Sequence, residues 1–273
     1  MRKLSIAAGV SLFILCGPPF PPRSARGQEQ SPRPELERQT NAADAKAFED
    51  GLKVNPDNLT AREWLISYYF QASLWSKAPE LEERREEHIF WLIEHHPESQ
   101  LAGSPEAGIL EMGSSQRSAA YQRGKQLWLE QVTRHPDSAQ ILRNAGMFVF
   151  SEDRDIAREL LEKASLLNPS DFLTSFMLAQ TYVQERALAK SPADKMALAE
   201  KALSIRERAL EKASPEDRFD QLADIATDAF EAGEMEKAEQ YAAELLQSSP
   251  QSKDHWNYGN AVHKDNLVLG RIA

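Results

Sequence analysis

The stretch from Ser138 to Pro169, SAQILRNAGMFVFSEDRDIARELLEKASLLNP, decides the fold of this chain. Its apolar residues recur every three or four positions, so that Ala157, Leu161 and Ala164 share one face of a helix. The stretch ends at a proline, which cannot donate an internal helix hydrogen bond and therefore stops the second helix. We interpret the whole stretch as two antiparallel helices of about 12–16 residues each.

Regularly spaced prolines extend this interpretation to most of the chain. Six prolines stand between polar residues, and the intervals between them are 41, 39, 33, 46 and 35 residues. Proline disfavours helical backbone in the residue before it and suits the first turn of a following helix, so each site marks a joint between helices. Strand signals are nearly absent. The predicted fold class is therefore all-α, built from stacked antiparallel helical hairpins. The six prolines are Pro56, Pro97, Pro136, Pro169, Pro215 and Pro250.

The spacing of small and large residues resembles the tetratricopeptide repeat, a helix-turn-helix unit of 34 residues. Two units fit its pattern closely, one ending at Pro169 and one at Pro250, and partial matches begin at Leu65 and Phe172. The resemblance covers residues 41–273 and implies an α-solenoid, a right-handed superhelix of about five units with partial ends. In the best unit the matching residues are Ile141, Ala145, Phe148, Ala157, Leu161, Ala164 and Pro169.

Two parts of the predicted solenoid depart from the pattern. Between Pro97 and Pro136 the residues 101–105 interrupt the helical periodicity, so we expect a turn or short helix there, and whether 98–136 form a complete repeat stays open. The last repeat has only begun its second helix at Ala273. We therefore expect that the natural chain is longer, or that this end meets a partner or another copy.

The first residues are typical of a targeting signal. The apolar stretch from Leu4 to Cys16 follows a positive start and is too short to span a bilayer as a helix. Residues 1–27 are therefore predicted to be a secretory signal peptide, and 28–40 a disordered Pro-rich linker. With the repeat pattern, this indicates an exported, bacterial-type repeat protein, periplasmic or secreted. The alternative is a lipoprotein signal that uses Cys16.

Charge and cysteine content restrict the partners. The chain has 42 acidic and 32 basic residues, which gives a formal net charge of −10. Removing residues 1–27 deletes four basic residues and no acidic ones, so the charge becomes −14. Such a chain repels nucleic acid, so we expect no nucleic-acid partner. A single cysteine excludes a disulfide framework and a Cys-based zinc site.

Residues with catalytic or metal-binding chemistry are sparse. His88, His95 and His96 share one predicted helix, but the His-Glu-x-x-His motif is absent, and we interpret them as a solvated helix end rather than a metal site. No Gly-x-Ser-x-Gly elbow and no Gly-rich phosphate loop occurs. We expect a protein that is not an enzyme and has no cofactor. An enzyme of unrecognised type is the alternative.

The resemblance also implies where a partner binds. In this family the first helix of each unit faces a concave surface, and here that surface mixes apolar anchors with amide and acidic groups. It lacks the Lys/Asn set with which some members hold a peptide carboxylate. It therefore fits an extended or helical protein segment with apolar side chains and some positive charge. The main groove residues are Glu63, Ser67, Phe70, Gln71, Phe176, Gln180, Gln184, Thr227, Phe230 and Glu231, with Leu142, Phe150 and Asp220 beside them.

Two functions are consistent with this pattern. The main hypothesis is a non-catalytic module that binds a protein or peptide in the concave groove. The alternative is a self-assembling scaffold or envelope-assembly factor, in which copies join through the incomplete C-terminal repeat to form a homo-oligomer.

Overall fold

The described residues form a stack of helices. The computed structural model describes residues 42–247 except 77, 111–114 and 212. Within these ranges it contains α-helices and two short 3-10 helices, and no strand. The expected signal peptide, the linker and the incomplete last repeat lie outside the described residues. No helix in the described part is both long and apolar enough to cross a membrane.

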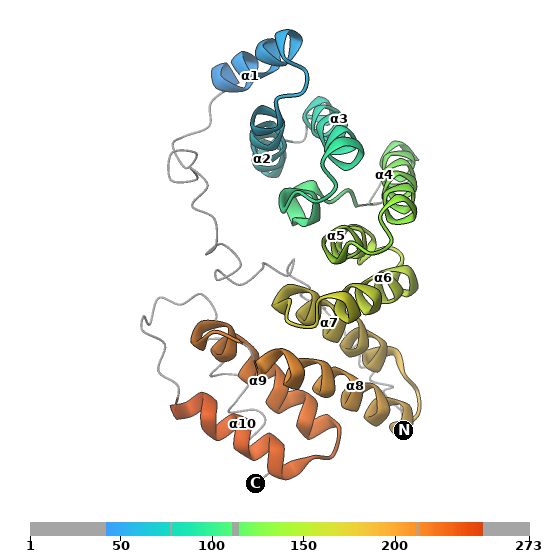
Figure 1. The fold of residues 1–273 in the computed structure, drawn as a ribbon, viewed down its shortest axis with the longest axis vertical. Coiled ribbons are helices and arrows are strands. Elements are labelled where there is room, and N and C mark those ends of the chain that lie inside the picture. Colours follow the sequence, from blue (N-terminus) through green and yellow to red (C-terminus); the bar gives the residue numbers. More distant parts are fainter. Residues whose placement is uncertain (1–41, 77, 111–114, 212, 248–273) are drawn as a thin grey trace, which may run out of the picture.

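The helices follow one another as antiparallel pairs along an open arc (Figure 1). Helices α2, α5 and α7 lie along the inner side of the arc, and α3, α4 and α6 along its outer side. This arrangement confirms the predicted all-α class of stacked helical hairpins. The elements are α1 (Ala42–Val54), α2 (Leu59–Trp75), α3 (Pro79–His95), η3 (Leu101–Gly103), η4 (Pro105–Ala107), α4 (Ser115–Arg134), α5 (Ala139–Val149), α6 (Arg154–Leu167), α7 (Phe172–Leu188), α8 (Pro192–Leu210), α9 (Pro215–Glu231) and α10 (Met235–Gln247).

Local sequence explains where the helices begin and end. Pro56, Pro97, Pro136 and Pro169 all fall between helices, and Pro215 is the first residue of α9, as the proline pattern predicts. Side-chain oxygens cap several helices, which stabilises each by about 1 kcal/mol. The capping residues are Asn58, Ser138, Asp171 and Ser191.

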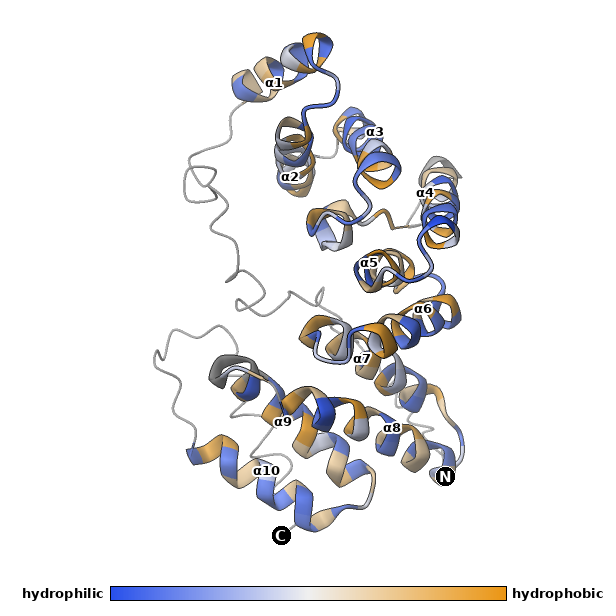
Figure 2. Ribbon diagram, viewed as in Figure 1, coloured by the Kyte–Doolittle hydropathy of each residue, from blue (hydrophilic) through white to orange (hydrophobic). Residues whose placement is uncertain are grey.

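Small residues let neighbouring helices approach closely. Ala145, Ala157 and Ala164 are fully buried, and they belong to one continuous core that runs from α2 to α8. A β-carbon added at Gly146 would lie 2.9 Å from Cγ of Leu161, so the α5–α6 contact requires glycine there. Figure 2 shows that most helices carry both apolar and polar residues, as expected when only one face is buried.

The hairpin of α7 and α8 has more residues than the hairpin of α5 and α6, and the additional residues lie in its helices rather than in its turn. Helices α7 and α8 contain 17 and 19 residues, against 11 and 14 in α5 and α6. Only 189–191 connect them.

The unit between Pro97 and Pro136 lacks a full first helix, as its interrupted periodicity predicts. Residues 99–109, the inner segment, contain η3 and η4 and contact α2, α3 and α5. The amide of Asn144 on α5 holds it by donating to the carbonyl oxygens of Pro97 and Ser99, both at 2.9 Å. A β-carbon at Gly103 would lie 2.7 Å from Cγ of Asn144, so only glycine fits this contact.

Candidate functional site

Two of the predicted groove residues on α2, Glu63 and Ser67, are already engaged by the inner segment. Glu63 accepts a hydrogen bond from the Ser99 hydroxyl at 2.6 Å, and the Ser67 hydroxyl donates to Glu106 at 2.7 Å. The side chains that make these two contacts are half-buried. The inner segment therefore covers the part of the α2 surface that the sequence assigned to a partner.

A buried arginine fixes this arrangement. Arg85 on α3 donates to the carbonyl oxygens of Glu106 and Gly108 at 2.7 and 3.0 Å, and it forms an ion pair with Glu82 at 2.7 Å. Its guanidinium carbon also lies 5.6 Å from the ring centroid of Phe70. Of the predicted groove residues on α2, only Gln71 is exposed.

Helix α7 presents an aromatic pair and two amides on one face. Phe172, Phe176, Gln180 and Gln184 are each four residues apart, and all are half-buried. The two phenylalanine rings stack with their centroids 6.4 Å apart. Within the described part of the chain, neither glutamine side chain makes a hydrogen bond. This face therefore combines apolar area with amide donors and acceptors that no neighbour uses.

The predicted residues of α9 lie on one face of that helix as well. Thr227, Phe230 and Glu231 are half-buried, and the Thr227 hydroxyl donates to the carbonyl oxygen of Ala223 at 2.8 Å. Phe230 packs against the core of the C-terminal hairpins. The side chain of Asp220 lies outside the described residues.

Buried charges join α7, α8 and α9 beneath these faces. Asp228 accepts from Arg206 and from Arg186, both at 3.0 Å, and Arg206 lies 3.5 Å from Asp224. Burial raises the pKa of Asp228, while the two guanidinium groups act in the opposite direction. The guanidinium carbon of Arg206 lies 5.4 Å from the ring centroid of Phe176, so the network positions this residue. The sequence analysis missed this network because 22 residues separate Arg206 from Asp228.

Two residues assigned to the groove are core residues instead. Leu142 and Phe150 are 1% and 8% exposed, because α5 packs against α6 and the inner segment on the faces that carry them. They offer no surface to a partner.

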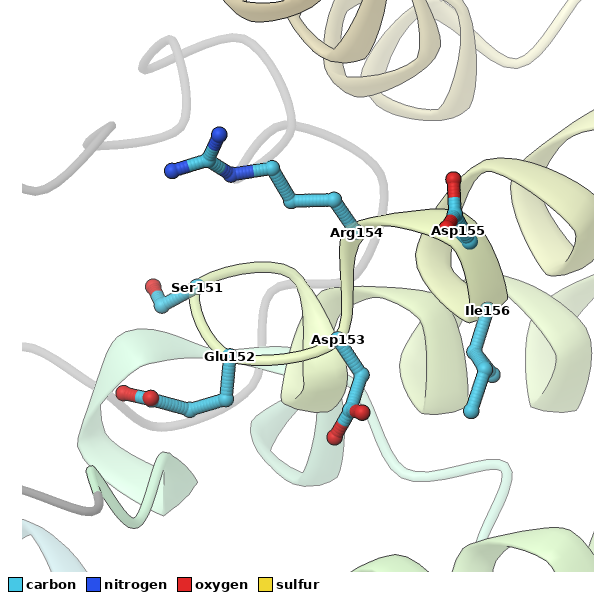
Figure 3. A pocket seen from close by; sticks show the side chains of 6 residues that line it. All are labelled: Ser151, Glu152, Asp153, Arg154, Asp155 and Ile156. Atoms are coloured by element: carbon cyan, nitrogen blue, oxygen red, sulfur yellow. The ribbon is translucent and has the colours of Figure 1, made fainter.

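A shallow hollow of about 350 Å³ lies at the turn between α5 and α6 (Figure 3). Arg154 and Asp155 project to one side of this turn and Asp153 to the other. Asp153 is held by the Tyr121 hydroxyl and by Lys125, and these contacts outweigh burial, so its pKa lies below its usual value. The Asp153 carboxylate is therefore a structural anion, held by contacts within the fold.

The histidines differ from the expected solvated helix end at one position. His95 is exposed, as predicted, and its ring stacks on Trp91 with a centroid distance of 4.6 Å. The prediction is wrong for His88, which is 4% exposed and lies between Glu49 and Arg62. In the described residues no group of three or more His, Cys, Asp or Glu side chains could hold a metal ion.

Comparison with known proteins finds structural likeness without a match in sequence. No family model matches the chain, and no curated protein matches it. Among solved structures, the human IFIT1 dimer with PPP-AAAA is similar, with 18% sequence identity and a TM-score of 0.48. The match covers 84% of this chain and 54% of that chain, so this chain spans about half the length of the matched protein. A likeness this distant carries no argument about what the chain binds.

Proposed function

We propose that this chain is a non-catalytic helical-repeat module that binds a protein or peptide segment on the half-exposed faces of α7 and α9. The observation that carries the proposal is the row of Phe172, Phe176, Gln180 and Gln184 on α7, whose glutamine amides no described neighbour uses. Phe230 adds a second apolar anchor on α9. This residue set offers what a peptide segment can use, namely apolar contacts for its side chains and polar partners for its backbone.

Preorganisation is the physical basis of the proposed binding. The buried contacts of Asp228 with Arg186 and Arg206 tie the two helices together, so the surface does not have to be ordered when a partner arrives. Binding then costs less conformational entropy than binding to a mobile surface. The α2 surface is excluded from the proposal because the inner segment occupies it.

Charge indicates the chemistry of the partner. The formal net charge of −10 favours a segment with basic residues beside its apolar ones, and it disfavours nucleic acid. We keep export, to the periplasm or the medium, as part of the proposal. It rests on the sequence of residues 1–27 alone.

Peptide selection tests the proposal. Peptides selected from a random displayed library on the purified protein are labelled, and their dissociation constants are measured by fluorescence anisotropy. Removing an anchor of this kind costs about 2 kcal/mol, so Phe176→Ala with Gln180→Ala should weaken binding about thirtyfold. Gln71→Ala, an exposed amide on α2, is the matched control and should leave binding unchanged. Selected peptides that bind the double variant as tightly as the natural protein would show that the surface is misassigned.

The scaffold alternative stays a prediction. It depends on residues 248–273, which lie outside the described residues. Sizing chromatography of the full chain over a range of concentrations, beside a variant that ends at residue 250, tests it. A concentration-dependent oligomer that the shortened variant cannot form would favour the scaffold over the peptide-binding module.

A further inference from the structure

An apolar contact and the carboxylate of Glu49 both help attach helix α1 to the stack. Only two of its residues, Ala45 and Leu52, are buried. Phe48 adds a ring contact with Trp64 on α2, at a centroid distance of 4.5 Å. Glu49 on α1 makes polar contacts with side chains of both α2 and α3. The docking of α1 therefore depends strongly on the state of this carboxylate.

Three groups converge on one oxygen of Glu49. The Tyr69 hydroxyl donates to Oε1 at 2.7 Å, Nε2 of His88 lies 3.2 Å from it, and Nη1 of Arg84 lies 3.6 Å from it. The rings of Tyr69 and His88 are nearly parallel, with centroids 6.1 Å apart. The carboxylate therefore joins α1 to α2 through Tyr69 and to α3 through His88 and Arg84.

The second nitrogen of His88 fixes the protonation state of the ring. Nδ1 lies 3.3 Å from Nη1 of Arg62, and a guanidinium group can only donate. Nδ1 must therefore be the unprotonated acceptor, and Nε2 carries the proton that points to Glu49. Arg62 is held in place, because it also donates to the Pro56 carbonyl oxygen at 2.9 and 2.8 Å and lies 4.2 Å from the ring centroid of Trp91.

A second proton on His88 would disrupt this arrangement. It would place an N–H at Nδ1 against an N–H of Arg62, with a second positive charge on a ring that is only 4% exposed. The charged or titratable groups that face His88 are Glu49 on α1, Arg62 and Tyr69 on α2, and Glu87 on α3. Arg84 reaches it only through Glu49. An ion pair between protonated His88 and Glu49 offsets only part of the cost of charging the buried ring.

The pKa shifts have a consistent sign. Burial lowers the pKa of His88 below its ordinary 6.5, although Glu49 raises it in part. For Glu49, burial acts to raise the pKa, but the contacts with Tyr69, His88 and Arg84 outweigh it, so the pKa lies below the ordinary 4.5. Lowered folded-state values mean that each group stabilises the docked state above its ordinary pKa. That stabilisation is lost as the pH falls, first at His88 and then at Glu49.

We propose that α1 is an acid-released helix, docked on α2 and α3 at neutral pH through the Glu49–His88–Arg62 contacts and undocked by acidification while α5–α8 stay folded. Undocking uncovers the α2 face that includes Ala61, Trp64 and Leu65, all buried in the docked state. The acidic form would therefore present an apolar surface that the neutral form hides.

Hydrogen exchange with mass spectrometry tests the proposal on the full chain. Protection of 42–54 is followed from pH 7.5 to 5.0, corrected for the intrinsic exchange rate at each pH. It should fall by up to about tenfold per pH unit, the limit for one linked proton, while 141–149 keep their protection. His88→Gln should remove this response, because its amide can donate to Glu49 and accept from Arg62 without titrating. His95→Gln, an exposed histidine on the same helix, should keep it.

Two results would overturn the proposal. One is protection of 42–54 that does not change with pH in the natural protein, and the other is an unchanged pH response in His88→Gln. If His88→Gln fails to dock α1 at any pH, an NMR titration of the natural protein decides. The His88 ring signals should then change below pH 6.5 together with the α1 amide signals, and a His88 titration that leaves the α1 amides unmoved would contradict the mechanism.

Discussion

Replacing Gly103 by alanine should destabilise the protein, although alanine usually loses less conformational entropy than glycine when a chain folds. Gly103 has no positive φ angle, so its backbone accepts a side chain without strain. The obstacle is Asn144 on α5. The new β-carbon would lie 2.7 Å from Cγ and 3.2 Å from Cα of Asn144, well inside normal contact distances.

The cost follows from what holds Asn144 in place. Its amide donates to the carbonyl oxygens of Pro97 and Ser99 at 2.9 Å each and accepts from Gln140 at 3.0 Å. Moving the side chain breaks two or three of these bonds, at about 1 kcal/mol each. Restricting the unfolded chain returns about 0.4–1 kcal/mol. We therefore expect a net loss of about 1–3 kcal/mol, which lowers the melting temperature by about 2–12 °C for a chain of this size.

Thermal unfolding followed by circular dichroism measures this effect, and Gly51→Ala is the control. Gly51 lies within α1 with no atom within 4 Å of an added β-carbon, so alanine there should stabilise by up to about 1 kcal/mol. Gly103→Ala should also cost less in an Asn144→Ala background, since the main clashing group is then absent. A Gly103→Ala variant that melts at or above the temperature of the natural protein would refute the reasoning.

Further predictions concern the helix interfaces. Burial and a carboxylate neighbour raise the pKa of Tyr69, Tyr182 and Tyr241 to about 12, so their contribution to stability is complete below pH 10 and is lost as the pH rises toward 12. An ultraviolet tyrosinate titration should show these tyrosines ionising late, and each Tyr→Phe variant should remove its share of the late phase. Tyr182→Phe removes one such hydrogen bond and should cost about 1 kcal/mol in a urea titration. Ala164→Leu should overpack the α5–α6 hairpin by about 1–3 kcal/mol, and an unchanged melting temperature would count against this packing. Asp228→Ala removes the buried carboxylate that Arg186 and Arg206 share and leaves Arg206 only its longer contact with Asp224, so it should cost about 3–5 kcal/mol. A loss below about 1 kcal/mol would contradict the buried network.

The helices and their joints could be predicted because they depend on local chemistry. Proline acts on its own backbone and its immediate neighbours, so Pro56 and Pro169 end helices wherever the rest of the chain goes. Small residues at helical spacing, such as Ala157 and Ala164, indicate close helix contacts for the same reason, and both are fully buried.

The binding surface was less predictable because it depends on contacts between distant residues. The inner segment reaches α2 and α5 through Glu106 and Asn144, and broken periodicity indicates a missing helix without indicating what fills its place. His88 likewise looks solvated from its own helix, since Glu49 lies 39 residues earlier.

One signal in the sequence could have found a recurrent polar contact. Tyr69 bonds to Glu49 and Tyr182 bonds to Glu162, and both pairs are 20 residues apart. In each pair the tyrosine lies on an inner helix and the carboxylate on the helix before it. A search for tyrosine and glutamate at this separation would have proposed both contacts.

This fixed separation limits how the chain can change in length during evolution. An insertion or deletion between Glu162 and Tyr182 would move the hydroxyl away from its carboxylate and leave a buried polar group to be satisfied by water. Helices α7 and α8 are longer than α5 and α6, and α7 continues beyond Tyr182 to Leu188. In related chains we therefore expect insertions and deletions to fall after Tyr69 or Tyr182. The number of residues between Glu49 and Tyr69, and between Glu162 and Tyr182, should stay constant.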